Sequence, residues 1–219
     1  MTSLSHTMFY MISALLAAGC ASVPETRFYT LSVPFEPSEA EGSLQRSPTP
    51  VYIEVLPVTV PERLARPQLV VRSRGSGQET QLLLLEQARW SSHFNDELRD
   101  AFAAGIADQT GAINETRGSR QAAHTPGWPV YRIAIELGQF DAIVGDRVQA
   151  RFGWTITRSS DGRSAACYAA ISEPASGGID GVVKGIQRMV SSTVVDVSKN
   201  LIELNTGQAA TCKPHKKID

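Results

Sequence analysis

The chain has 219 residues, with 22 acidic and 21 basic side chains, and a formal net charge of −1 at pH 7. This length is typical of a single domain with a sizeable hydrophobic core. The balanced charge argues against a general nucleic-acid-binding protein, because such proteins normally show a strong basic excess.

The first notable segment is a short apolar run over residues 8–18, directly before Gly19 and Cys20. A run of about 11 residues is too short to span a bilayer, which needs about 20, but it is typical of a secretory signal. Residues 16–20 resemble a bacterial lipobox, in which the cysteine thiol receives a diacylglycerol and the chain is cut before it. Two alternatives are an ordinary signal-peptide cysteine and a buried apolar helix. Residues 1–13 contain no Lys or Arg, although secretory signals normally carry positive charge there.

We therefore interpret residues 1–19 as a lipoprotein signal peptide and residues 20–26 as a lipidated tether. A folded domain is expected over residues 27–212 and a polar tail over residues 213–219. Six residues follow Cys20 before the domain begins, and they reach about 20 Å when fully extended. The domain is therefore expected to lie close to the membrane.

The first half of the domain is expected to be mainly β-structure, because it is rich in β-branched and aromatic residues bounded by turn residues. Strands are expected over residues 27–33, 51–58, 68–72 and 80–85. The last two flank a glycine-containing tip over residues 73–77 and predict a β-hairpin. Proline-rich polar sequence predicts a loop over residues 34–50.

An amphipathic helix is expected next, over residues 92–109. Large apolar residues recur every four positions from Trp90 to Ile106 and would form a stripe that packs on the sheet. Ser91 or Ser92 is expected to cap its first turn, and Gly111 to end it. A polar loop is expected over residues 114–129.

Three strands with alternating apolar residues follow, over residues 130–140, 147–158 and 164–172. Asp161-Gly162 is expected to form the tight turn between the last two. A long amphipathic helix over residues 179–204 completes the domain. This order predicts an α+β fold, with a mostly antiparallel sheet and two helices packed on one face.

The chain contains three cysteines, Cys20, Cys167 and Cys212. If Cys20 carries the lipid, an even pair remains in a compartment that permits disulfides. We therefore expect a Cys167–Cys212 disulfide, with two free thiols as the alternative.

Signatures of enzymes are missing from the sequence. The four histidines are scattered, and there is no HExxH, CxxC or phosphate-binding GxxxxGK[ST] pattern. We therefore expect no catalytic activity, no cofactor and no metal.

One local charge cluster stands out, because four arginines fall within twelve residues with only Glu62 to oppose them. They are Arg63, Arg66, Arg72 and Arg74. They could contact a partner protein or anionic lipid headgroups. The alternative is a solvated hairpin whose charges prevent pairing at its edge.

Several of these segments together resemble the ABC-type transport auxiliary lipoprotein family, which includes paraquat-inducible protein C. The segments that carry the resemblance are Phe28-Tyr29-Thr30-Leu31, Leu56-Pro57-Val58, Val60-Pro61-Glu62 with Leu64, Arg66-Pro67-Gln68-Leu69-Val70, and Arg89-Trp90. Beyond residue 110 the similarity is one of element order.

The resemblance implies a non-catalytic accessory subunit of an envelope transport system that moves lipids or other hydrophobic cargo. Its expected partners are an MCE-domain periplasmic protein and the inner-membrane subunits of that system, and it could form a homo-oligomer. Ala21 follows Cys20 in place of the aspartate that retains lipoproteins in the inner membrane of enteric bacteria. An outer-membrane lipoprotein facing the periplasm of a Gram-negative bacterium is therefore expected. Two roles remain open: docking to the partner, or carrying a lipid or solute in a cavity.

Overall fold

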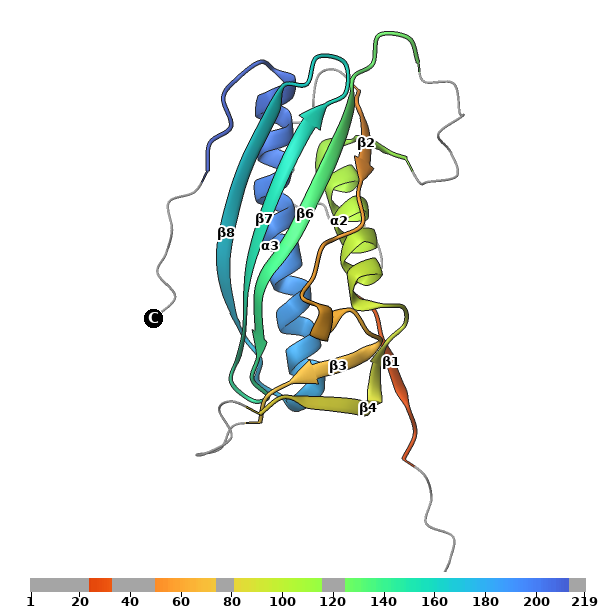
Figure 1. Cartoon of the computed structure of the whole chain (residues 1–219), viewed down its shortest axis with the longest axis vertical. Helices are drawn as coiled ribbons and strands as arrows, with labels where there is room; N and C mark the ends of the chain where they lie inside the picture. The colour runs from red at the N-terminus through yellow and green to blue at the C-terminus, as the bar shows by residue number, and fades with distance from the viewer. Residues whose placement is uncertain (1–23, 33–49, 74–80, 116–124, 213–219) are drawn as a thin grey trace, which may run out of the picture.

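Three long strands of alternating sequence form the centre of the structure (Figure 1). They are β6 (Val130–Ala142), β7 (Arg147–Arg158) and β8 (Ser164–Pro174), which pair antiparallel in sequence order. On the free side of β6, β2 (Tyr52–Val55) and then β5 (Ile113–Asn114) are added in parallel. The computed structural model describes residues 24–32, 50–73, 81–115 and 125–212.

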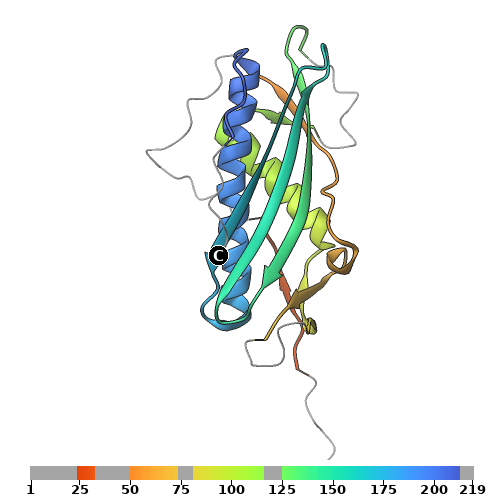
Figure 2. The same ribbon diagram turned by 60° about the vertical axis from the view of Figure 1, so that its left-hand side comes forward.

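Two helices, α2 (Phe94–Thr110) and α3 (Gly178–Asn205), cover one face of this five-stranded sheet (Figures 1 and 2). Glycines set how closely these layers approach. A Cβ atom on Gly105 of α2 would lie 2.9 Å from a methyl group of Val194 on α3. A Cβ on Gly185 of α3 would lie 2.7 Å from a methyl group of Val148 on β7. Larger side chains at these two positions would push the layers apart.

A second, three-stranded sheet closes one end of the molecule (Figure 1). Its order is β1 (Arg27–Tyr29), β4 (Leu83–Trp90) and β3 (Gln68–Val71), with β1 parallel and β3 antiparallel to β4. The short 3₁₀ helix η1 (Glu62–Leu64) leads into β3. The first turns of α2 and α3 lie beside this sheet, and we call the whole region the β1 end.

The expected α+β class, with two helices on one face of a sheet, is confirmed. The strands nevertheless form two sheets, and both contain parallel pairs. Most expected elements are found with shifted ends. The strands expected over residues 27–33 and 51–58 are shorter, at residues 27–29 and 52–55, whereas the second strand of the hairpin extends to residue 90. The short strand β5 overlaps the start of the loop expected over residues 114–129.

Trp90 does not belong to the helix that its spacing suggested. It is the last residue of β4, and it stacks on Phe94 of α2 with ring centroids 5.1 Å apart. The four-residue spacing continues from strand to helix because both side chains enter the same core.

The segment after α3 returns along the edge strand β8. Cys212 in this segment forms a disulfide with Cys167 of β8, with a Cα–Cα distance of 5.5 Å. Next to it, Asn200 of α3 donates a hydrogen bond to the carbonyl oxygen of Thr211 (3.2 Å), and the Thr211 amide donates to Glu203 (2.8 Å). These contacts cover part of the β8 edge.

Replacing Cys212 with Ser is expected to lower the free energy of unfolding by about 4 kcal/mol, because the disulfide closes a long loop in the unfolded chain. Chemical denaturation of the oxidised protein measures this loss. A Cys167→Ser, Cys212→Ser double variant is the control and should be only slightly less stable than the single variant. Two free thiols in non-reducing mass spectrometry of the mature wild-type protein would contradict the prediction.

Candidate functional site

The β1 end is organised around one buried carboxylate, that of Glu97 in the first turn of α2. Its Oε2 atom accepts hydrogen bonds from the Thr30 hydroxyl (2.8 Å) and the Leu31 amide (2.9 Å), both just after β1. Its Oε1 atom accepts from the Ser91 hydroxyl (2.6 Å) and from both the hydroxyl and the amide of Ser92 (2.9 and 3.1 Å). The two oxygens thus join the N-terminal segment to the turn between β4 and α2. We call these five residues the Glu97 cluster.

The cluster keeps Glu97 ionised despite its burial. Burial by itself raises the pKa of this carboxyl. Hydrogen bonds from Ser91, Leu31, Thr30 and Ser92 act in the opposite direction and together outweigh burial, so the pKa of Glu97 lies below its ordinary value. The charged form is therefore the one that the fold stabilises.

The expected serine cap of α2 is wrong. His93 occupies the N-cap position without a side-chain cap hydrogen bond, while Ser91 and Ser92 donate to Glu97 instead. The carboxylate is a stronger acceptor than a neutral oxygen, and it also satisfies the Ser92 amide. Gly111 ends the helix as expected, in a left-handed conformation with φ 70°.

A second set of polar contacts joins β1 to the first turn of α3. The Tyr29 hydroxyl donates to Asp180 (2.7 Å), and Arg27 lies 3.9 Å from the same carboxylate. Gln187, two turns further along α3, donates to the carbonyl oxygen of Thr30 (3.1 Å). The strand that follows the tether is therefore held by both helices.

The four clustered arginines have different environments. Arg63 is exposed on η1, Arg66 is half-buried just after it, and neither forms an ion pair with another described residue. Arg72 instead pairs with Asp141 of β6 at 2.5 Å, and its backbone bridges to Ile143. Arg74 lies outside the described residues, as do Cys20 and the segment expected to be a signal peptide.

The Arg72 pair therefore has a structural function, because it joins the second sheet to the end of β6. The two residues are 69 positions apart in the sequence, and no local pattern indicates this contact. Arg63 lies nearby, lining the same shallow depression as Asp141.

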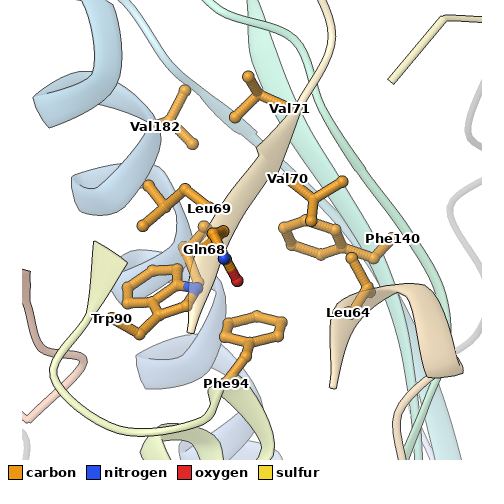
Figure 3. A pocket seen from close by; sticks show the side chains of 10 residues that line it. Leu64, Gln68, Leu69, Val70, Val71, Trp90, Phe94, Phe140 and Val182 are labelled. Atoms are coloured by element: carbon orange, nitrogen blue, oxygen red, sulfur yellow. The ribbon is translucent and has the colours of Figure 1, made fainter. Parts of the chain in front are cut away.

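The junction between the second sheet and the helices is filled by apolar side chains from six elements (Figure 3). Phe94 packs between Trp90 and Phe140, with centroids 5.1 and 5.6 Å away. The space left at this junction and the space in the depression beside Arg63 are each about the size of one water molecule. Neither space can hold an acyl chain.

Among the described residues, no group of three His, Cys, Asp or Glu side chains is arranged to hold a metal ion. No helix in those ranges is long and apolar enough to cross a bilayer.

Comparison with known proteins supports the family resemblance found in the sequence. The family model described as "ABC-type transport auxiliary lipoprotein component" matches residues 29–198, from β1 into α3. The chain belongs to this family. No curated protein sequence matches it significantly.

Solved structures show the same fold at low sequence identity. A Xanthomonas campestris protein of the DUF330 family is 14% identical, with a TM-score of 0.58, over 83% of this chain and 98% of that one. An uncharacterized protein is also 14% identical with a TM-score of 0.58, over 81% of this chain and 99% of that one. At this identity the similarity concerns the fold alone.

Replacing Glu97 with Gln is expected to destabilise this family member by about 1–3 kcal/mol at neutral pH. An amide has only one acceptor oxygen, so either the Leu31 amide or the Ser92 amide loses its partner. Thermal or chemical unfolding measures the loss, and Glu86→Gln, on an exposed side chain of β4, is the control.

The destabilisation should also depend on pH. The folded-state pKa of Glu97 is below its unfolded value, so its contribution is complete above the unfolded pKa and is lost as pH falls through the folded pKa. The difference between wild type and Glu97→Gln should therefore shrink below the ordinary titration range of glutamate. A difference that stays constant to pH 2 would contradict this assignment.

Proposed function

We propose that this protein is a membrane-anchored, non-catalytic auxiliary subunit of an ABC-type transport system, and that it docks to an MCE-domain periplasmic partner at the outer membrane. Membership of the family supports the auxiliary function. The lipid on Cys20 would supply the anchor. The partner identified from the resemblance would bring the cargo, and its associated subunits would supply any ATP hydrolysis.

The position of β1 supports an anchored docking protein. β1 begins seven residues after Cys20 and lies at one end of the molecule (Figure 1). The Glu97 cluster and Asp180 attach this strand to both helices, so the anchor would hold the whole domain near the bilayer. A subunit that receives the end of a transport assembly needs this placement.

Packing at the junction favours docking over carrying cargo. A carrier needs an apolar cavity of several hundred Å³. The junction between the second sheet and the helices is instead filled by aromatic and aliphatic side chains. Stoichiometric lipid extracted from the purified protein, beyond its own acyl chains, would overturn this preference.

Cys20→Ala is expected to move the protein from the membrane fraction to the soluble periplasmic fraction, because the anchor is lost. Fractionation of cells that express each form, followed by immunoblotting, measures the change. Ser22→Ala, two residues beyond the modified cysteine, is the control and should remain in the membrane. A Cys20→Ala protein that stays in the membrane fraction would contradict the lipid anchor.

Arg63 and Arg66 are the arginines of the cluster that we expect to contact the partner, since Arg72 already has a structural ion pair. Replacing both with Gln should weaken binding about fivefold and reduce its dependence on salt. Binding is measured by capturing the MCE-domain subunit on the tagged mature protein at several salt concentrations.

Arg151→Gln, on the exposed face of β7, is the matched control because it also removes surface charge. It should leave capture unchanged. Equal capture by wild type and the Arg63→Gln, Arg66→Gln variant would remove this surface from the proposal.

A further inference from the structure

Phe28, in the centre of β1, is the most exposed large apolar side chain among the described residues. Its exposed fraction is 66%, whereas the next values are 45% for Leu84 and Tyr168. Burying a phenylalanine stabilises a fold by about 1.5–3 kcal/mol. Leaving this one in water therefore requires other contacts that hold the strand in this orientation.

Those contacts are polar and come from the neighbours of Phe28. Arg27 and Tyr29 both approach Asp180 of α3, which places their side chains on the helix side of β1. Side chains alternate along a strand, so Phe28 lies on the opposite side, away from α3. A shift of one residue would turn Phe28 inward, but it would also break the contacts with Asp180 and the Glu97 cluster.

The position of Phe28 in the chain indicates what covers it. It follows Cys20 by eight residues, which span at most about 28 Å. Phenylalanine is among the apolar side chains that interfacial segments bury at the boundary between the headgroups and the acyl chains. Arg89, the register partner of Phe28 on β4, also lies next to it, with its guanidinium paired to Glu86 at 3.2 Å.

We propose that Phe28 inserts into the interface of the bilayer that carries the Cys20 lipid, and that it fixes the orientation of the domain on that bilayer. This inference rests on the proposed lipidation of Cys20. The anchor limits the distance from the membrane, and Phe28 determines which end of the domain faces it. Contact of Phe28 with a partner protein, or with a second copy of this chain, would be the alternative to contact with the bilayer.

The test uses mature Phe28→Trp protein, extracted from cell membranes and reconstituted into phosphatidylethanolamine–phosphatidylglycerol vesicles. Parallel vesicles carry bromine on the lipid acyl chains, which quenches tryptophan at short range. Val195→Trp is the matched control, because Val195 is 40% exposed on α3, about 25 Å along the helix from Gly178. Fluorescence of the wild-type protein, with its three native tryptophans, is subtracted from both.

The added fluorescence of Phe28→Trp is expected to shift to shorter wavelength in vesicles and to be lost in brominated lipid. The added fluorescence of Val195→Trp should not change.

A flotation experiment tests the anchor separately: the wild-type protein should float with the vesicles and the Cys20→Ala variant should not. If the wild type floats but Trp fluorescence from position 28 survives bromine, the anchor stands and the Phe28 contact is wrong. If that fluorescence is protected from aqueous acrylamide but is not quenched by bromine, a protein covers position 28. This result would also overturn the proposal. If the wild type does not float, both proposals fail.

Discussion

The β1 end depends on one ionised carboxylate buried where three segments meet. Glu97 accepts hydrogen bonds from two backbone amides and three hydroxyls. These donors belong to parts of the chain about 60 residues apart. A buried charge is costly unless its hydrogen bonds are complete, so the loss of any one donor weakens the attachment of β1. The short strand β1, with three residues, could not keep its place on β4 through backbone pairing alone.

The attachment of β1 determines from which end of the domain the N-terminal segment leaves. The longer sheet and its two helices form a packed body, in which Gly105 and Gly185 allow close contact between layers. The second sheet closes one end of that body, and the Arg72–Asp141 pair joins it to β6. The segment that leads to Cys20 emerges from the same end. The filled junction, and two arginines that form no ion pair with another described residue, therefore lie at the end from which the N-terminal segment leaves the domain.

Local sequence patterns were sufficient for the regular part of the fold. The alternation in β7 predicted its bounds without error, Gly111 ends α2 as expected, and Gly162 has a positive φ in the connection between β7 and β8. The family resemblance is confirmed by the family model that matches residues 29–198. These features depend on residues close in sequence, where periodicity and turn chemistry act directly.

Most contacts of the candidate site could not be predicted from local sequence patterns. Glu97 could be placed in the first turn of a helix, but its partners Thr30 and Leu31 are more than 60 residues away. The same holds for Tyr29 with Asp180, and for Arg72 with Asp141. Parallel pairing of β1 with β4 cannot be deduced from either strand alone, because both directions suit the same alternation.

The parallel pairing of β1 with β4 also determines how the domain bears mechanical load. A pull on the tether along the strand axis stretches all the β1–β4 hydrogen bonds together, so they resist in shear and do not open one at a time. The side-chain bonds to Glu97 and Asp180 share the same load and pass it to α2 and α3. Tension applied through the N-terminal segment is therefore resisted by the whole of β1 and by its side-chain contacts together.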